Sequence, residues 1–300
     1  LQRYAYPDYY KKHQDRKQEL AESHNHTTQG PVSCLQLRGE YLFVAEGKGG
    51  FRVYDTANIA NKGVSQRIVT APYSPLGQNT HIASKNATCM ALPTNQPIAP
   101  ARNQGDLMRI TNQEQPFHPS YHYAFITDAE EGLIVTNVDT LVDGDPQNNF
   151  LTRAATWNPK GLLNGARHIT LGGRYAYVST PTGLVIIDID KPLEPQHVAT
   201  VPMTDVRASA LQFRYLFVTD QTGLRVIDIT NPTKPILQKA SVPLKDARKL
   251  YVARTFAYVA GGSEGLAIID VEKPTEPRLY QLFTAGGQMN DVQDVVVGST

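Results

Sequence analysis

The side chains best suited to chemistry are the two cysteines of the chain and one of its eight histidines. Cys34 and Cys89 hold the same position in two similar apolar segments, VSCLQL and ATCMAL, and His168 holds it in a third. Thiolate sulfur and imidazole nitrogen are ligands for zinc and other soft metals. If the three side chains converge, they form a metal site or a redox pair.

Packing offers a second explanation, which we favour. Small, buried cysteines fill tight positions between strands well. Neighbouring strands of separate sheets can also lie too far apart for a disulfide, which requires Cα atoms within about 7 Å. The same position in later segments holds Ala210, Lys249 and Asp294, which supply no clear pair of nucleophile and base.

Several sequence motifs that define common active sites are missing from the chain. It contains no His-Glu-x-x-His and no phosphate-binding Gly-Lys-Ser/Thr loop. It also lacks the Cys-x-x-Cys-His motif that attaches haem. We therefore predict no catalytic residues and no cofactor bound by this chain. A metal at Cys34, Cys89 and His168, or the haem of a partner protein, are the alternatives.

The elements that would position these residues come from an internal repeat. RYAYVSTPTGLVIID (174–188) resembles RYLFVTDQTGLRVID (214–228) and TFAYVAGGSEGLAIID (255–270), and more divergent copies cover 40–55 and 122–137. The period is about 40 residues, which is typical of propellers and other repeat proteins. The apolar runs are short, rich in β-branched and aromatic residues and bounded by Gly or Pro, which predicts strands rather than helices.

Each repeat is predicted to contain four short antiparallel strands, the pattern of a propeller blade. We therefore predict an all-β chain that folds as a β-propeller of four-stranded antiparallel blades, six or more in the complete protein. The chain is expected to be part of a longer one. The blades are expected at 31–72, 86–157 with an insertion at 97–120, 165–204, 207–244 and 246–285, and the start of a sixth at 291–300.

Three segments fall outside the repeat, and the shortest is an insertion at 71–86. Residues 1–30 are predicted to form an irregular or helical N-terminal arm, because they carry no apolar stripe. The insertion at 97–120 is rich in proline and has no period. Long insertions in compact domains are uncommon unless they are functional, so this one is a candidate for binding a partner.

Two residue types recur at fixed places in the repeat. A glycine opens the third strand, where a tight turn favours φ > 0, and an acid or amide closes that strand. We interpret both as structural, with the acid accepting backbone N–H bonds from the following turn rather than binding a metal. These positions are Gly50, Gly132, Gly183, Gly223 and Gly265, and Asp55, Asn137, Asp188, Asp228 and Asp270.

The segments GLVIIDI (183–189), GLRVIDI (223–229) and GLAIIDV (265–271), each followed by a Pro-x-x-Pro pair, resemble the LVIVD-repeat family. The resemblance is specific over 165–300 and weaker over 32–165. It implies a β-propeller in a secreted or cell-surface protein, and it brings no catalytic residue to this sequence.

The composition of the chain limits the kinds of partner that it can bind. The chain has 29 basic and 28 acidic residues, a formal charge of +1, which gives no electrostatic basis for binding nucleic acid. No apolar run is long enough to span a membrane. We expect a non-catalytic scaffold for protein–protein interaction, located outside the cell, at its surface or in the periplasm as the resemblance implies. Two alternatives stay open: an accessory propeller of an extracellular multihaem cytochrome or redox complex, and an enzyme with a site at the mouth of the propeller channel.

Overall fold

The computed structural model describes residues 31–39, 41–56, 69–70, 80–94, 110, 117–143 and 150–298. Strands dominate these residues, which contain short 3-10 turns and no α-helix, so nothing in them could cross a bilayer as a helix. For these residues, the prediction of an all-β fold is confirmed. The predicted arm at 1–30 and most of the insertion at 97–120 lie outside the described residues.

The chain divides into two compact units. Unit one comprises residues 1–164 and 190–193, and unit two comprises residues 165–189 and 194–300. We call the five sheets one to five in chain order. Sheets one and two belong to unit one, and sheets three to five belong to unit two.

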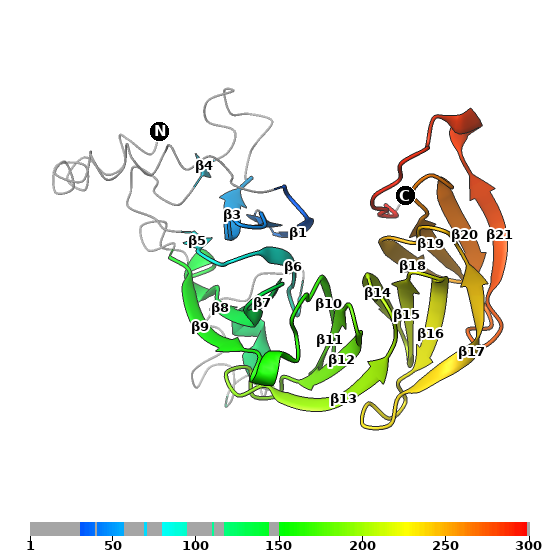
Figure 1. Ribbon diagram of the computed structural model, residues 1–300. Helices are drawn as coiled ribbons and strands as arrows, with labels where there is room; N and C mark the ends of the chain where they lie inside the picture. The colour runs from blue at the N-terminus through cyan, green and yellow to red at the C-terminus, as the bar shows by residue number, and fades with distance from the viewer. Residues whose placement is uncertain are drawn as a thin grey trace, which may run out of the picture. The chain divides into compact units, whose positions relative to one another are not determined.

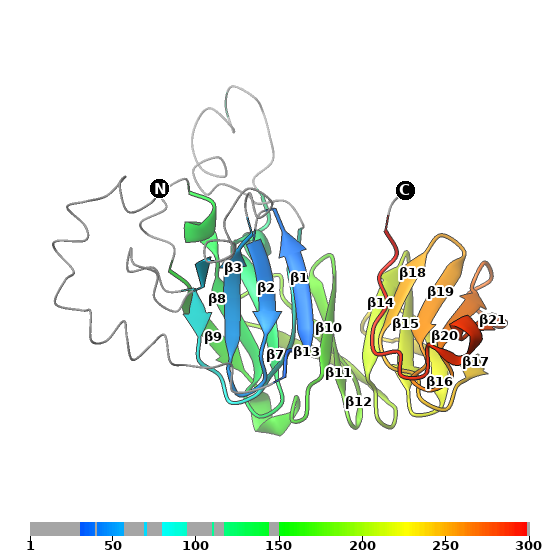
Figure 2. The ribbon, with the colours of Figure 1, turned by 90° about the horizontal axis from the view of Figure 1, so that it is seen from above.

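Unit one contains two antiparallel sheets. Sheet one has the order β1-β2-β3-β4, with β5 also paired to β3, and sheet two has the order β6-β7-β8-β9. The first strands β1 and β6 contact each other across the two sheets (Figure 1, Figure 2). The strands are β1 (Cys34–Arg38), β2 (Tyr41–Ala45), β3 (Phe51–Asp55), β4 (Val69–Thr70), β5 (His81–Ile82), β6 (Ala87–Ala91), β7 (Tyr123–Asp128), β8 (Gly132–Asn137) and β9 (Thr152–Trp157).

Unit two contains three four-stranded antiparallel sheets in the same simple order. Their first strands β10, β14 and β18 lie side by side, and their fourth strands form the outer edge, as Figure 1 shows for this unit. The strands are β10 (His168–Gly172), β11 (Tyr175–Thr180), β12 (Gly183–Asp188), β13 (Gln196–Pro202), β14 (Ala208–Gln212), β15 (Tyr215–Asp220), β16 (Gly223–Asp228), β17 (Ile236–Pro243), β18 (Leu250–Ala253), β19 (Phe256–Ala260), β20 (Leu266–Asp270) and β21 (Arg278–Phe283).

The core of unit two lies between neighbouring sheets, because the second and third strands of each sheet are apolar on both faces. One layer joins sheets three and four, through Tyr177, Leu184 and Ile186 on one side and Leu216, Val218 and Ile227 on the other. The next layer joins sheets four and five, through Phe217, Leu224 and Val226 on one side and Ala257, Val259, Ala267 and Ile269 on the other. Alternation along a strand sends successive side chains to opposite faces, so sheet four contributes to both layers.

The segment after sheet five differs from the sequence prediction. A strand is expected at 292–297, but only Val292 pairs, in an isolated bridge with Gly262. The first strand of each other sheet obtains its hydrogen bonds from the second strand of the same sheet. No strand of that kind lies beside residues 293–298 in the part of the chain that the structure describes.

The turn between β15 and β16 shows why a glycine opens the third strand. Gly223 has a φ of +132°, and a Cβ there would lie 2.1 Å from the carbonyl oxygen of Val242 in β17. Asp220 completes the turn, since its Oδ1 accepts from the backbone N–H groups of Thr222 at 2.7 Å and Gly223 at 3.2 Å. A side chain at Gly223 would therefore push β16 and β17 apart.

We expect Gly223→Ala to lower the free energy of unfolding by about 2–3 kcal/mol, because it adds a steric clash to an unfavourable φ. Gly173→Ala is the matched control: Gly173 also has a positive φ, +58°, but a Cβ there meets nothing within 4 Å. The control should cost about 1 kcal/mol, from the left-handed conformation alone. Urea titration of both variants measures the difference, and equal losses would contradict the clash.

Candidate functional site

The strand register shows which residues share the position of the two cysteines. Cys34, Cys89 and His168 lie opposite Ala45, Thr127 and Ser179, each the same residue of a second strand. In sheet four, Ala208 holds this place opposite Thr219, whereas Ala210 lies two residues further along, opposite Phe217. The prediction of Ala210 is therefore wrong by two residues. The carbonyl of Lys249 accepts from Ala260, which places Lys249 at the equivalent position just before β18.

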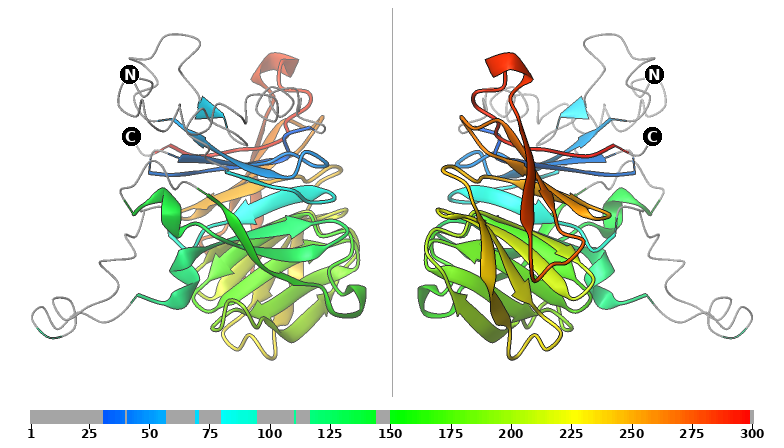
Figure 3. Two further views of the ribbon diagram at one scale, coloured as in Figure 1. Left: turned by 90° about the vertical axis from the view of Figure 1, so that its left-hand side faces the viewer. Right: turned by 90° about the vertical axis from the view of Figure 1, so that its right-hand side faces the viewer.

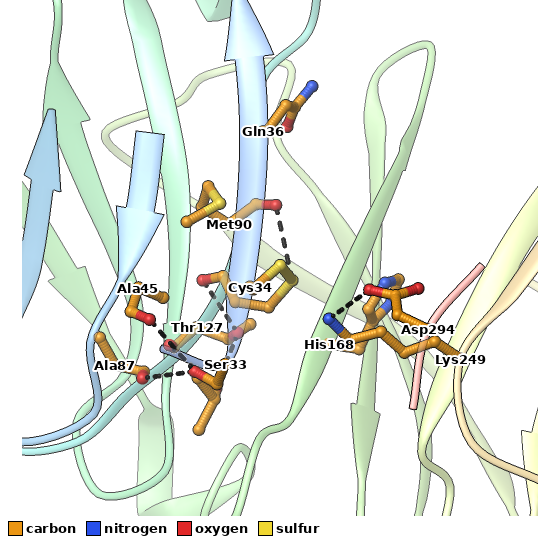
Figure 4. The surroundings of a disulfide bond; sticks show 12 residues. Ser33, Cys34, Gln36, Ala45, Ala87, Met90, Thr127, His168, Lys249 and Asp294 are labelled. Atoms are coloured by element: carbon orange, nitrogen blue, oxygen red, sulfur yellow. Dashed lines mark hydrogen bonds and ion pairs between the residues drawn. A yellow bond between two sulfur atoms is a disulfide. The ribbon is translucent and has the colours of Figure 1, made fainter. Parts of the chain in front are cut away.

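Cys34 and Cys89 form a disulfide that joins β1 of sheet one to β6 of sheet two, with 4.8 Å between the Cα atoms (Figure 4). Both cysteines are buried. Ser33 lies beside the bond and donates its hydroxyl to the carbonyls of Ala45 and Ala87, at 3.4 and 3.3 Å. The two first strands therefore lie close enough for a covalent link, contrary to the preference for simple packing.

The disulfide also overturns the metal site predicted at Cys34, Cys89 and His168. A thiolate is the form of cysteine that binds a metal, and neither cysteine keeps a free thiol. Among the described residues, no group of three or more His, Cys, Asp or Glu side chains could hold a metal ion. At this position of unit one, a disulfide links the two sheets.

His168 and Lys249 belong to unit two and have different surroundings. The Nζ of Lys249 lies 3.0 Å from Oδ2 of Asp294 (Figure 4). The Nδ1 of His168 accepts from the backbone N–H of Ser209, at 3.4 Å. Burial, helped by the charge of Lys249 and opposed by that of Asp294, lowers the pKa of His168 to about 4. The imidazole is therefore neutral at pH 7, and its Nδ1 is occupied by a backbone group.

A chain of alternating arginines and aspartates crosses unit two just before the first strands. Arg167 pairs with Asp205, and Arg207 donates to Asp205 at 2.9 Å and to Asp246 at 2.7 Å. Arg248 then lies 2.7 Å from Asp246 and 2.7 Å from Asp291. Each of the three aspartates binds an arginine of the preceding repeat. Asp205 and Asp246 also bind an arginine of their own repeat.

This row of ion pairs was not predicted from the sequence, although the sequence contains a signal for it. Asp-x-Arg occurs at 205–207 and 246–248, and Asp-Val-Gln occurs at 291–293, about one repeat apart each time. Recognising that motif would also have given the correct alignment of Ala208. The spacing follows from strand geometry, since residues two apart point to the same side.

The aspartates of this row of ion pairs are stabilised in their ionised form. Hydrogen bonds from Arg248, followed by those from Arg207, hold the pKa of Asp246 below its usual value. Burial acts to raise the pKa of Asp205, but hydrogen bonds from Arg167 and Arg207 outweigh it and lower the pKa. Because the folded-state pKa is lower than the unfolded value, these pairs stabilise the fold above about pH 4 and lose that effect as the pH falls further.

The acids that close the third strands accept hydrogen bonds from the turns that follow. The Oδ1 of Asp228 accepts from the backbone N–H of Thr230 at 2.8 Å, and that of Asp270 accepts from Glu272 at 2.9 Å. Asn137 does the same for Asp139, at 3.0 Å. Asp188 pairs with Arg174, and the side chain of Asp55 lies outside the described residues.

These observations define a class of protein: an all-β repeat protein whose four-stranded antiparallel sheets match those of β-propellers. The family model for the LVIVD repeat matches residues 29–70, 165–201, 210–241 and 245–284, half of the chain. The chain therefore belongs to the LVIVD repeat family, as its sequence indicates.

Solved structures share the fold at low sequence identity. The periplasmic gluconolactonase PpgL of Pseudomonas aeruginosa matches with a TM-score of 0.57 and 16% identity, over 87% of this chain and 70% of that one. The computationally designed protein Ika8 matches with a TM-score of 0.55 and 8% identity, over 89% of this chain and 65% of its own. A chain of a nidogen/laminin complex matches with a TM-score of 0.52 and 8% identity, over 88% and 83%. No curated protein matches the sequence.

Removing the disulfide should destabilise unit one. We expect Cys34→Ala combined with Cys89→Ala to lower the free energy of unfolding by about 2–4 kcal/mol, because the link restricts the unfolded chain between the two cysteines. Reductant should lower the Tm of the wild type toward that of the variant and leave the variant unchanged. Identical melting of the wild type with and without reductant would contradict a structural role.

Breaking the ion-pair chain should have an effect that depends on pH. We expect Asp205→Asn to lower the free energy of unfolding by about 1 kcal/mol at pH 7, because it weakens pairs with two arginines. The difference from the wild type should shrink as the pH falls below about 4, because protonation of Asp205 removes its ion pairs. Denaturant titrations across this pH range test the sign; a constant difference would argue against ion pairing.

Proposed function

We propose that this chain is a non-catalytic scaffold that holds a protein partner through the insertion between β6 and β7. The observation that carries the proposal is the length of this connection. It comprises residues 92–122, whereas residues 173–174 connect β10 to β11 and residues 213–214 connect β14 to β15. Connections of that length in compact domains are commonly binding elements placed on a rigid framework.

Both ends of the insertion are held by side chains of unit one. The backbone N–H of Leu92 donates to Oε1 of Gln36 in β1, at 3.1 Å. At the other end, residues Pro119–His122 form a 3-10 turn that buries Ser120. His122 closes this turn against sheet two, with its Nδ1 2.6 Å from Oδ1 of Asp139. Such anchoring fixes where the insertion leaves and re-enters the sheet.

The framework is suited to this role because links between sheets reinforce it. The disulfide joins the two sheets of unit one, and the arginine–aspartate ion pairs join the three sheets of unit two. The polar side chains next to the first strands thus bind one another. This use of charge favours a supporting role over catalysis, which needs polar groups that remain available to a substrate.

We further propose an extracytoplasmic location and a complete propeller of six or more blades. A buried disulfide persists where the surroundings are oxidising, as in the periplasm or outside the cell. The similarity to a periplasmic protein of Pseudomonas aeruginosa concerns the fold and is consistent with that location. Thiol trapping in intact cells tests it: the cysteines of the endogenous protein should resist alkylation until they are reduced.

Replacing residues 95–116 with a short Gly-Ser linker should abolish partner binding and leave the fold intact, since the anchors at Gln36, Leu92 and His122 remain. The measurement is affinity purification of the tagged protein from the envelope of its native host, after cross-linking. A component present in stoichiometric amount with the wild type should be lost with the replacement.

Leu193→Ser serves as the matched control, because it changes an exposed apolar side chain in a different connection. It should retain the component. If the replacement variant keeps the component while its Tm matches that of the wild type, the insertion is not the binding element.

A further inference from the structure

Phe213 lies in the two-residue turn between β14 and β15, in a backbone conformation that large side chains rarely adopt. Its φ is +53°. The first residues of the equivalent turns after β1, β10 and β18 are Gly39, Gly173 and Arg254, with φ values of +56°, +58° and +54°. Glycine is favoured at such a position because it has no Cβ. For a bulky residue, a positive φ is uncommon and lowers stability.

The side chain of Phe213 does not compensate for this strain by packing. It is 93% exposed, the highest value among the large apolar side chains that the structure describes. Gly173 shows that the same turn forms without a side chain. Backbone strain that the fold itself does not require is typical of positions that contact a ligand or partner. The phenyl ring is therefore placed for a contact outside the chain.

Arginines surround Phe213. Each of the three neighbouring turns of unit two contains one exposed arginine, and none contains an acidic residue. The turns lie together because β10, β14 and β18 are side by side, and Nε2 of Gln212 donates to the carbonyl oxygen of Arg254 at 2.7 Å. We call these turns the arginine turns; they are residues 173–174, 213–214 and 254–255.

Nearby aspartates offset part of this positive charge. Asp188 pairs with Arg174, and Asp228 contributes a negative charge near Arg214. Neither Arg214 nor Arg254 forms an ion pair within the part of the chain that the structure describes. The guanidinium of Arg214 lies over the ring of Tyr215, 5.1 Å from its centroid. Two arginines beside Phe213 therefore keep a charge that an anionic partner can bind.

The arrangement suits a lipid surface better than a pocket on another protein. A hot spot between proteins lies within a ring of packed contacts that exclude water, whereas Phe213 is the one large apolar side chain of the arginine turns. A bilayer needs no such ring of contacts. A single aromatic side chain can enter the boundary between headgroups and acyl chains, while arginines beside it stay among anionic headgroups.

We propose that the arginine turns are a peripheral membrane-binding site. Phe213 inserts into the surface of a bilayer that contains anionic lipids, and Arg214 and Arg254 bind the phosphate groups of its lipids. The contact is weak and reversible, because one ring and a few arginines provide little binding energy. This inference is independent of what the insertion between β6 and β7 binds.

Sedimentation with vesicles tests the site. We expect the wild type to bind vesicles made of phosphatidylcholine and phosphatidylglycerol in equal parts, and vesicles of phosphatidylcholine alone about ten-fold more weakly. Phe213→Gly should weaken binding to the mixed vesicles about ten-fold. The same variant should raise the Tm by about 2 °C, because glycine relieves the strain. Arg254→Gln should weaken binding about five-fold and leave the Tm unchanged.

Phe283→Ser is the matched control. Phe283 is also an exposed phenylalanine, at 45%, but it lies in β21 at the opposite edge of sheet five from the turn at 254–255. β21 runs along the near side of sheet five in the right-hand view of Figure 3. The control should bind the mixed vesicles as the wild type does. Equal binding by the wild type and Phe213→Gly, or no preference for anionic vesicles, would overturn the proposal.

Fluorescence measures whether the ring enters the bilayer. Phe213→Trp combined with Trp157→Phe leaves a single tryptophan in the chain, at the tip of the turn. Brominated phosphatidylcholine in the mixed vesicles should quench its emission. Binding without quenching would contradict insertion. If the chain binds no vesicle and instead forms a dimer that Phe213→Gly dissociates, the ring contacts a second copy and the lipid proposal is wrong.

Discussion

The structure of unit two depends on the packing of sheet four between sheets three and five. In β15, Phe217 and Val218 point to opposite faces, and both are fully buried. A sheet with apolar side chains on both faces is not stable alone in water, since burial of each such side chain contributes about 1.5–3 kcal/mol. Fold, repeat period and the links between sheets all follow from this requirement.

The inter-sheet links gather near the first strands because neighbouring sheets contact each other there. At one register position the chain places a disulfide between Cys34 and Cys89 and an ion pair between Lys249 and Asp294. One link is covalent and the other is ionic, but both join neighbouring sheets. The register position that holds Cys34, Cys89 and His168 therefore stabilises the fold. The arginine–aspartate ion pairs beside it also link neighbouring sheets in unit two.

The strands could be predicted from sequence because their signals are local. Glycine at a forced turn, proline after a strand and runs of β-branched residues depend only on neighbouring residues. The pairing of Cys34 with Cys89 could not be derived in this way, because it depends on the distance between strands of different sheets. The same reason hid the ion-pair chain, whose partners lie about one repeat apart. The short β5 at His81–Ile82, which pairs with β3 from within a predicted insertion, was missed because two residues carry no period.

Packing on both faces also explains why sheets one and five expose apolar side chains of a kind that sheet four buries. Sheet one exposes Leu35 and Leu37, each 57%, on the face whose equivalent in sheets four and five packs against the preceding sheet. Sheet five exposes the opposite kind of face, the one that elsewhere packs against the following sheet. Within unit two, each kind of face is covered by a neighbouring sheet. The apolar side chains that sheets one and five expose are therefore the ones that this repeat uses for packing between sheets.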